Sequence, residues 1–418
     1  MENKEEHLNI HWQARKPLWF LRPIEYVGAW LFSGPFGSRT KFNHINKVSY
    51  KEPSLIFSNH ASFIDFPNVI VDMFPRRQCW VISIEEFNDR EFLMRGLGGL
   101  AKRKFTNDVE LIKHIVELIK VKKISVVIYP EARFSLAGIN EDLGEGLGRL
   151  VKMCECPVIV FNQKGNFLRS PQWNKRPYRN VRVYADVTTV ISKEDALTMD
   201  PNEIQERIEE SFIYDEYRWQ FDNKIKIKSK YRAKNIHKIL YKCPECGNEH
   251  EMDSDGTSLW CNACGAYWDM DEYGELHQRG GVAKYPIVSN WYRWERDEAI
   301  KEVNEGRYSV KSRCRLEKLT GFKHGFKTLG FVDMTHDENG YTIQGTLDDG
   351  SEFYLNKPCL TTRSMHIEYD YKGREDALDI ATIEDTWFLF PLEIKNCLTK
   401  FNFVTEALYF KAKAKANK

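Results

Sequence analysis

The segment Ser54-Leu55-Ile56-Phe57-Ser58-Asn59-His60-Ala61-Ser62-Phe63-Ile64-Asp65 decides the fold, because an apolar run of strand length passes directly into a polar turn. Residues 124–135 repeat this pattern, with an apolar run followed by Tyr129-Pro130-Glu131-Ala132-Arg133-Phe134-Ser135. The first segment puts a His five residues before an Asp. The second puts a Glu and an Arg on the turn after a buried strand.

Strand-like and helix-like stretches alternate through residues 45–220. The expected elements occupy residues 79–83, 108–121, 124–129, 157–161, 181–188 and 201–212. Strands that alternate with helices are typical of α/β proteins, in which helices cover a central sheet. The sequence therefore predicts a layered α/β domain over residues 45–221.

A His five residues before an Asp is a weak pattern by itself. With 11 His in the chain, about half a chance occurrence is expected if roughly one residue in twenty is Asp. His250 and Asp255 form such an occurrence, which we expect on a surface hairpin. The functional interpretation is that His60 takes a proton from an alcohol while Asp65 holds its tautomer. The alternative is that His60 caps a helix and Asp65 pairs locally.

The context of the pair favours catalysis. Asn59 and Ser62 flank it in the order Asn-His-x-Ser-x-x-Asp, and Glu131 follows His60 by 71 residues (131 − 60). Together these motifs resemble the glycerolipid (lysophospholipid) acyltransferase superfamily, in its 1-acylglycerol-3-phosphate acyltransferase-like form. The resemblance covers about residues 45–190.

The resemblance implies transfer of a fatty acyl group from a thioester donor, acyl-CoA or acyl carrier protein, to the hydroxyl of a lysophospholipid. The default acceptor is 1-acylglycerol 3-phosphate, which would give phosphatidic acid. His60 is then the base and Asp65 its orienting partner, with the substrate hydroxyl in the place of the Ser of a Ser-His-Asp triad. Asn59, Ser62 and Glu131 are expected to contact the substrate; the alternative for Glu131 is a cap on the next helix.

Two further blocks extend the resemblance. Gly99-Leu100-Ala101-Lys102-Arg103 is similar to a Gly-rich segment whose Arg binds the acceptor phosphate; a simple turn with a surface charge is the alternative. Cys156-Pro157-Val158-Ile159-Val160 is similar to an apolar block that lines the acyl pocket.

The Glu131 block departs from the family form Phe-Pro-Glu-Gly-Thr-Arg-Ser. Ala132 replaces Gly, Arg133 stands where Thr would be, and Phe134 stands where Arg would be. The positive charge is present but displaced by one residue, and adjacent side chains on a turn point in different directions. Arg103 and Arg133 are therefore the candidate phosphate contacts, and catalysis is better supported than the identity of the acceptor.

Composition sets wide limits. The 418 residues, 42% of them hydrophobic, suffice for two or three domains. The net charge of +1 gives no global indication of nucleic-acid binding. The N-terminus is polar, without a visible signal peptide, and no apolar run reaches the ~18 residues of a spanning helix. With 10 Cys, six of them scattered, we expect a reducing, cytoplasmic compartment.

Residues 1–44 form an aromatic segment interleaved with basic residues. Its aromatic side chains are Trp12, Trp19, Phe20, Tyr26, Trp30, Phe32 and Phe36. Pro23 can open a helix that carries Ile24, Val27, Trp30 and Leu31 on one face. Two interpretations remain open: the segment lies at a membrane interface, or its helix packs on the core of the domain.

From Lys224 to Lys242, eight Lys or Arg residues occur with no acid among them. We interpret residues 222–242 as a solvated basic linker. The alternative is contact with anionic lipid headgroups or with an acidic carrier protein.

Two Cys-x-x-Cys pairs, Cys243 with Cys246 and Cys261 with Cys264, are separated by 14 residues, and a Gly follows each pair. Two thiolate pairs on two such turns can close a tetrahedral shell around Zn²⁺. The spacing predicts a zinc ribbon over residues 243–280. The zinc is structural, since a complete Cys₄ shell leaves no open coordination position.

Residues 281–418 are rich in Tyr, Phe, Thr and Ile, with turn signals such as Asp337-Glu338-Asn339-Gly340. We expect a β-rich domain of short antiparallel strands, closed by a helix over residues 396–412. A small barrel or a sheet capped by a helix, loosely similar to a pleckstrin-homology-type lipid-binding fold, fits this pattern. The basic tail at 411–418 is expected to be disordered.

The sequence thus predicts an O-acyltransferase that binds peripherally to the inner, cytoplasmic face of a membrane. Its expected partners are the lipid surface, a lysophospholipid and acyl carrier protein, with no nucleic acid. The main alternative is a non-catalytic lipid- or partner-binding protein built on an acyltransferase-like domain. Nucleic-acid binding through the ribbon and the basic linker is a second alternative, disfavoured by the low net charge.

Overall fold

The computed structural model describes residues 10, 12–34, 39–43, 48–49, 51–174, 179–323, 325–373 and 375–416. Parts of the predicted segment 1–44, among them Phe36, lie outside these residues. The chain divides into two compact units. Unit 1 comprises Met1–Pro171, Tyr178–Glu216 and Gly321–Lys323, and unit 2 comprises Gln172–Pro177, Tyr217–Thr320 and His324–Lys418. The five predicted segment boundaries stay a prediction.

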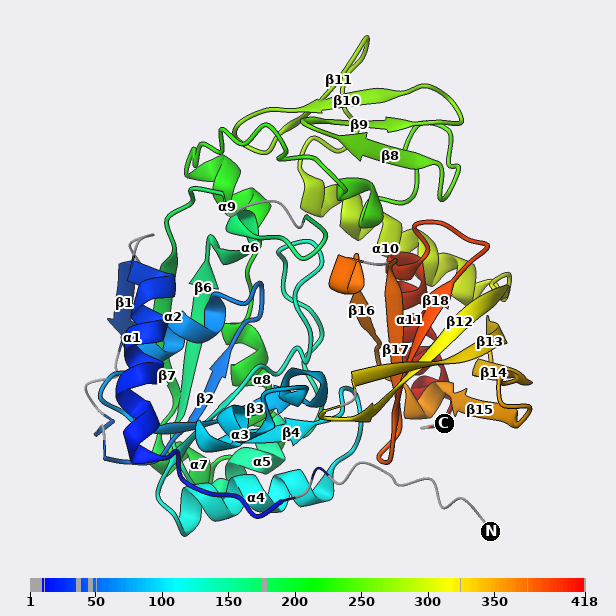
Figure 1. Cartoon of the computed structure of the whole chain (residues 1–418). Helices are drawn as coiled ribbons and strands as arrows, with labels where there is room; N and C mark the ends of the chain where they lie inside the picture. The colour runs from blue at the N-terminus through cyan, green and yellow to red at the C-terminus, as the bar shows by residue number, and fades with distance from the viewer. Residues whose placement is uncertain are drawn as a thin grey trace. The chain divides into compact units, whose positions relative to one another are not determined.

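Unit 1 is built on a seven-stranded sheet (Figure 1). Its strands are β1 (Arg39–Asn43), β2 (Leu55–Ser58), β3 (Gln78–Ser83), β4 (Gly99–Lys102), β5 (Ser125–Ile128), β6 (Val158–Lys164) and β7 (Tyr184–Ile191). Its helices are α1 (Arg22–Ser33), α2 (Asp65–Asp72), α3 (Glu91–Gly96), α4 (Val109–Lys120), α5 (Leu147–Cys154), α6 (Asn166–Arg169), α7 (Lys193–Thr198) and α8 (Pro201–Ser211). This is the predicted layered α/β fold.

The strand order is β1-β7-β6-β2-β5-β3-β4. Strands β6, β2, β5, β3 and β4 are parallel, while β7 runs antiparallel to β6. Parallel strands end at the same edge of a sheet, and side chains that follow them gather there. The polar residues after β2 and β5 therefore meet.

Both faces of this sheet are buried, which explains the continuous apolar runs. Along β2, Leu55 and Phe57 enter one core cluster with α4, α5 and α8, whereas Ile56 enters the other with α2. The block predicted to line an acyl pocket lies in β6, where Val158 and Ile159 pack into these two cores. Asp108 caps α4 by accepting from the N–H of Leu111 at 2.9 Å.

Helix α1 has an unusual polarity. Its buried residues are Glu25, Ala29 and Ser33, spaced four apart on one face. The predicted apolar face is exposed instead, with Ile24 at 67% and Leu31 at 58%. The helix does pack on the domain core, as the alternative held, but through the face that carries Ala29, and the predicted apolar face stays exposed. No helix among the described residues has the length and apolarity needed to cross a membrane.

Unit 2 contains two antiparallel sheets. The smaller has the order β11-β10-β9-β8, and the larger β15-β14-β13-β12-β18-β17-β16. The strands are β8 (Met252–Asp255), β9 (Ser258–Cys261), β10 (Tyr267–Met270), β11 (Leu276–Gln278), β12 (Val310–Gly321), β13 (Gly325–Asp337), β14 (Gly340–Thr346), β15 (Glu352–Pro358), β16 (His366–Glu368), β17 (Ala377–Ala381) and β18 (Thr386–Pro391). The helices are α10 (Val288–Asn304) and α11 (Leu398–Ala416), while α9 (Glu216–Asp222) contains the division between the units.

Two expectations about unit 2 are corrected. The predicted disordered tail is helical to Ala416, because alternating Lys and Ala favour helix and Lys411 donates to the carbonyl of Val303. The predicted solvated linker is packed in its second half, where Ile236 and Leu240 are fully buried, whereas Lys224, Lys226, Lys228 and Lys230 in its first half are exposed.

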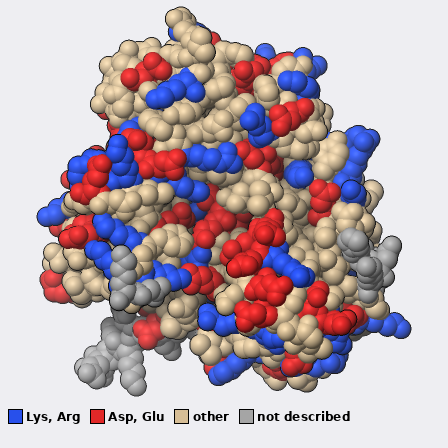
Figure 2. All heavy atoms as spheres, turned by 180° about the vertical axis from the view of Figure 1, so that it is seen from behind, with Lys and Arg blue, Asp and Glu red and all other residues tan. Residues whose placement is uncertain are grey.

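Several Lys residues of the segment 222–242 form ion pairs. Lys226 pairs with Glu272 at 2.6 Å and Lys234 with Asp255 at 2.9 Å. Lys238 pairs with an Asp and Lys242 with two Glu residues. On the face shown in Figure 2, Lys and Arg side chains lie interspersed with Asp and Glu side chains.

Candidate active site

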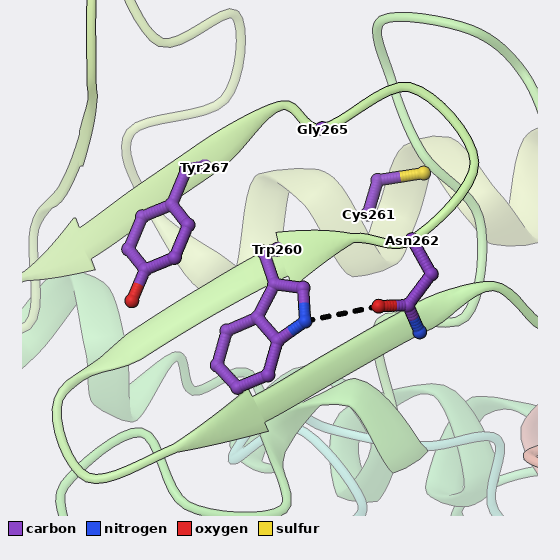
Figure 3. Close-up of a pocket in the computed structure, with 5 residues that line it drawn as sticks. All are labelled: Trp260, Cys261, Asn262, Gly265 and Tyr267. Atoms are coloured by element: carbon purple, nitrogen blue, oxygen red, sulfur yellow. Dashed lines mark hydrogen bonds between the residues drawn. The ribbon is translucent and has the colours of Figure 1, made fainter.

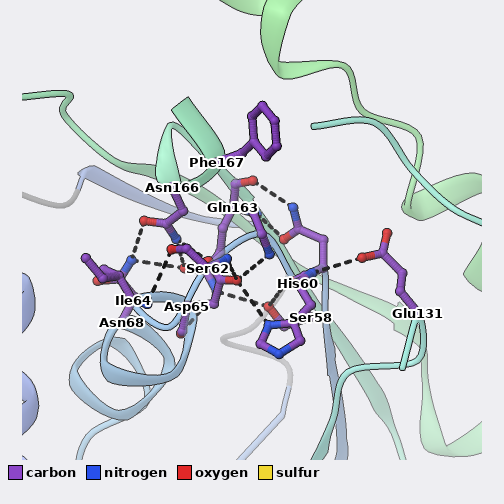
Figure 4. A network of polar contacts seen from close by, with 12 residues as sticks. Ser58, His60, Ser62, Ile64, Asp65, Asn68, Glu131, Gln163, Asn166 and Phe167 are labelled. Carbon is purple, nitrogen blue, oxygen red and sulfur yellow. Dashed lines mark hydrogen bonds and ion pairs between the residues drawn. The ribbon is translucent and has the colours of Figure 1, made fainter. Parts of the chain in front are cut away.

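The structure brings His60 and Asp65 together across the loop from β2 to α2 (Figure 4). Nδ1 of His60 lies 3.2 Å from Oδ2 of Asp65, the first residue of α2. The backbone N–H groups of Ala61 and Ser62 donate to the same oxygen at 2.5 and 2.8 Å. The loop therefore wraps around the buried carboxylate, and His60 contacts Asp65 directly although the two are five residues apart in the sequence.

Asp65 accepts hydrogen bonds at both carboxylate oxygens. Oδ1 accepts from Nδ2 of Asn166 at 2.5 Å, while Oδ2 faces His60 and the two backbone donors. An ionised carboxylate only accepts, so the ring proton of His60 is assigned to Nδ1. Nε2 then keeps its lone pair, which is the tautomer that a general base needs.

Two aromatic rings hold the imidazole. Tyr129 stacks on His60 with centroids 4.0 Å apart and planes at 23°, and Phe134 lies 4.2 Å away at 44°. Both rings come from the turn after β5. The side chain of His60 remains 20% exposed, so the held ring is still reachable.

Glu131 connects the β5 turn to the β2 loop. Its Oε2 accepts from the backbone N–H of His60 at 3.0 Å, and its Oε1 accepts from the hydroxyl of Tyr214 at 2.9 Å. The N–H of Glu141 also reaches Oε1, at 3.4 Å. Burial raises the pKa of Glu131 to about 8, against the opposing effect of the bonds from His60 and Tyr214. The carboxyl braces the backbone of the predicted base.

The two predicted phosphate contacts are both buried. Arg133 forms an ion pair with Glu141, with 3.1 Å between Nη2 and Oε2 and side chains 3% and 1% exposed. The side chain of this Arg therefore meets an internal acid, and its predicted phosphate contact stays a prediction. Arg103 follows β4 at the same sheet edge as His60. Strands β5 and β3 lie between them, about 14 Å at ~4.8 Å per strand.

The two residues that flank the pair make internal contacts. The amide of Asn59 donates to the carbonyl of Gln163 at 2.8 Å and accepts from its N–H at 2.7 Å. The hydroxyl of Ser62 accepts from the N–H of Ile64 at 3.3 Å. Both are buried, at 1% and 5% exposure. Their predicted contact with substrate stays a prediction.

Sequence reasoning missed a layer of amides beneath the pair. Nε2 of Gln163 donates to Oγ of Ser58 at 3.0 Å and to the carbonyl of Asp65 at 3.2 Å. Its Oε1 accepts from Asn68 and Asn166, both at 3.0 Å. Figure 4 shows these side chains converging on Asp65. The available signal was the polar end of β6, where amides directly follow the apolar run.

The four predicted metal ligands converge in unit 2. Their sulfurs all lie within 4.8 Å of one another, with 3.7 Å between Cys243 and Cys264 and 3.8 Å between Cys246 and Cys261. A tetrahedral shell with Zn–S bonds of about 2.3 Å has edges of about 3.8 Å. The donor set therefore fits Zn²⁺.

The two turns that carry these sulfurs repeat each other. The N–H of Gly247 donates to the backbone carbonyl of Cys243 and that of Gly265 to the backbone carbonyl of Cys261, both at 2.9 Å. Both glycines have φ near +75°, a conformation that costs Gly little. The turns therefore have the backbone that the glycines were predicted to permit.

An open groove of about 420 Å³ lies beside these turns (Figure 3). Trp260 and Tyr267 line it as stacked rings, with centroids 5.7 Å apart and planes at 11°. The indole N–H of Trp260 donates to Asn262 at 3.1 Å. The guanidinium carbon of Arg279 lies 3.9 Å from the ring centroid of Tyr267, and two of its nitrogens donate to the two carboxylate oxygens of Asp269.

A family model and a solved structure are each similar to part of this chain. The family model described as Acyltransferase matches residues 39–162, which contain His60, Asp65 and Glu131. A crystal structure of the 1-acyl-sn-glycerophosphate (LPA) acyltransferase PlsC from Thermotoga maritima is similar at 15% identity and a TM-score of 0.35, covering 46% of this chain and 78% of that one. The comparison with curated proteins found no match. Residues 39–162 therefore form an acyltransferase-like domain.

Proposed function

We propose that the protein transfers a fatty acyl group from a thioester to the hydroxyl of a lysophospholipid, by default 1-acylglycerol 3-phosphate, which gives phosphatidic acid. One observation carries this proposal: the buried carboxylate of Asp65 accepts hydrogen bonds at both oxygens and lies beside Nδ1 of His60, whose ring is partly exposed. This arrangement presents an unprotonated Nε2, which an acceptor hydroxyl requires.

In the proposed reaction, Nε2 of His60 takes the hydroxyl proton as the alcohol oxygen attacks the thioester carbonyl. Asp65 stabilises the imidazolium that forms. The C–S bond then breaks, and His60 returns the proton to the leaving thiolate. The acyl group moves directly to the alcohol, and no acyl-enzyme forms. Acyl-CoA and acyl carrier protein supply the same thioester, so both remain donors in this proposal.

The surrounding residues divide into two roles. Arg103 is the proposed contact for the acceptor phosphate, since it follows a parallel strand at the site edge. Arg133 instead stabilises the β5 turn through Glu141. Glu131 accepts a hydrogen bond from the backbone N–H of His60. The side chain of Asn59, the residue after β2, hydrogen-bonds the backbone of Gln163 on β6.

The proposed membrane contact is the outer face of α1. Soluble helices bury their apolar side and expose the polar one. Here the polar Glu25 is 7% exposed, while Ile24 and Leu31 are 67% and 58% exposed. Burial raises the pKa of Glu25 to about 7, against the effect of the neighbouring Arg22. An inverted helix of this kind suits peripheral binding at the headgroup level, and we place it on the cytoplasmic face.

Zinc in this proposal is structural. Cys243, Cys246, Cys261 and Cys264 would hold it in a closed shell that stabilises the ribbon. The transfer reaction uses none of these residues.

An acyl-transfer assay with purified full-length protein tests the function. Labelled acyl-CoA and acyl carrier protein are offered with a panel of lysophospholipids and glycerol 3-phosphate, and His60→Ala is run in parallel. Transfer by the wild type, with a loss of about 10³-fold or more in the variant, supports catalysis and identifies the acceptor. Equal transfer by both proteins refutes the role of His60. Absence of transfer with every acceptor, in folded zinc-loaded protein, favours the lipid-binding alternative.

A further inference from the structure

We infer that Asn166 is a positioning residue for the acyl transfer, because its side-chain amide holds one carboxylate oxygen of Asp65 while the other faces His60. This inference rests on the proposed function. Asn166 and Asp65 are 101 residues apart, and the 2.5 Å bond between them is buried. The side chain of Asn166 hydrogen-bonds Asp65, Gln163 and Asn68 and not the imidazole of His60, so its effect passes through Asp65.

The hydrogen-bond network fixes the orientation of each amide. Oδ1 of Asp65 can only accept, so Asn166 must turn its NH₂ group toward it. The same NH₂ group donates to Oε1 of Gln163, whose own NH₂ group donates to Ser58 and to the carbonyl of Asp65. Asn68 supplies the remaining donor to Gln163. A flip of any one amide would oppose two donors or two acceptors.

The backbone that carries Asn166 is held independently. Glu216 accepts from the N–H groups of Gly165, Phe167 and Leu168 at 2.8, 3.4 and 3.3 Å. Gly165 has φ +95°, and a Cβ there would lie 2.6 Å from a backbone oxygen. These hydrogen bonds and the need for Gly at position 165 restrict the turn after β6 to one backbone conformation. A rigid backbone places the amide of Asn166 at a fixed distance from Asp65.

Loss of the Asn166 amide leaves Oδ1 of a buried carboxylate without a donor. The ionised form of Asp65 is then disfavoured, and the His60–Asp65 pair takes up a proton more readily. The reactive state, with neutral His60 and ionised Asp65, becomes scarcer at low pH. The acidic limb of the kcat/KM profile should therefore move to higher pH.

The experiment compares Asn166→Ala, Asn166→Ser and Asn166→Asp with wild type in the full chain. The control is Asn162→Ala, since Asn162 lies on β6, just before the turn that carries Asn166, but donates to the carbonyl of Ser211. We expect kcat to fall about 10- to 100-fold in Asn166→Ala, as for loss of a hydrogen bond to a charge. KM should stay within about 2-fold, because no bound substrate group loses a contact.

The other variants grade the effect. Asn166→Ser keeps a donor and should retain more activity than Asn166→Ala. Asn166→Asp puts a second carboxylate against Asp65 and should lose most. Asn162→Ala should stay within about 2-fold of wild type. A folded Asn166→Ala with unchanged kcat and unchanged pH profile would overturn the inference, as would an equal loss in Asn162→Ala.

A readout independent of activity separates this inference from the proposed function. In ¹⁵N-histidine-labelled protein, the signal of His60 is assigned by its absence in His60→Ala. Wild type should show the neutral ring protonated at Nδ1, and Asn166→Ala should show a mixture of tautomers. If wild type transfers no acyl group, the function fails while this comparison still decides the role of Asn166. Identical ring signals in both proteins refute that role.

Discussion

Replacing Ile24 and Leu31 with Ser tests whether the outer face of α1 binds a membrane. The two side chains are 67% and 58% exposed, and full burial of such a side chain contributes about 2 kcal/mol. Transfer of the exposed parts into lipid is then worth about 1.3 and about 1.2 kcal/mol, together about 2.5 kcal/mol. At 1.4 kcal/mol per decade, the double variant should bind vesicles about 60-fold more weakly.

Sedimentation with vesicles of phosphatidylcholine and phosphatidylglycerol measures this change. The matched control is Val282→Ser, which removes an apolar side chain that is 92% exposed in unit 2. The control should bind as wild type does, and thermal unfolding should be unaffected in both proteins, because neither removes a core contact. If Ile24→Ser/Leu31→Ser binds vesicles within about 3-fold of wild type, the α1 face does not contact the membrane.

Three other outcomes concern unfolding and zinc. Arg133→Ala leaves the carboxylate of Glu141 buried without this partner, so denaturation should show a free energy of unfolding lower by about 3–5 kcal/mol. The double variant Arg133→Met/Glu141→Leu should be more stable than the single variant. The opposite order would contradict the ion pair. Cys261→Ser opens the metal shell, and elemental analysis should show loss of zinc from the purified protein; undiminished zinc would refute this site. Burial raises the pKa of Glu216 to about 8, above its ordinary 4.5, so its contribution is full below about pH 4.5 and is lost as the pH rises through about 8. The stability difference between wild type and Glu216→Gln should shrink from about pH 5 to about pH 8.5, and a difference that grows would contradict this reasoning.

The sequence predicted those parts of the fold that depend on local patterns. The apolar runs of β2, β5 and β6 appear in the chain as short blocks between polar turns, and parallel strands buried on both faces require such blocks. The contact of His60 with Asp65 could be anticipated because both lie on one short loop. The paired Cys turns were similarly local, since each turn needs only four residues and a Gly.

Contacts between distant residues could not be predicted in this way. The amide of Asn166 reaches Asp65 across 101 residues, and nothing in the spacing says which way a buried amide points. The ion pair of Arg133 could not be anticipated, because its partner, Glu141, lies on a loop without periodicity. The second half of the segment 222–242 did carry a sign that it is packed, since the buried Ile236 and Leu240 interrupt its cations. The prediction of a solvated linker gave more weight to the number of charges than to this apolar pattern.

The exposed face of α1 and the catalytic loop adjoin each other within unit 1. Phe63 lies between His60 and Asp65, is 52% exposed, and has its ring centroid 6.0 Å from that of Phe32 on α1. A membrane that receives the α1 face therefore also meets the loop that holds the proposed base. Lysophospholipid hydroxyls lie at the headgroup level, the depth that an interfacial helix reaches. In the proposed function, the acceptor approaches His60 within the interface and the thioester donor approaches from the aqueous side. This proposal accounts for aromatic side chains exposed beside a buried polar network.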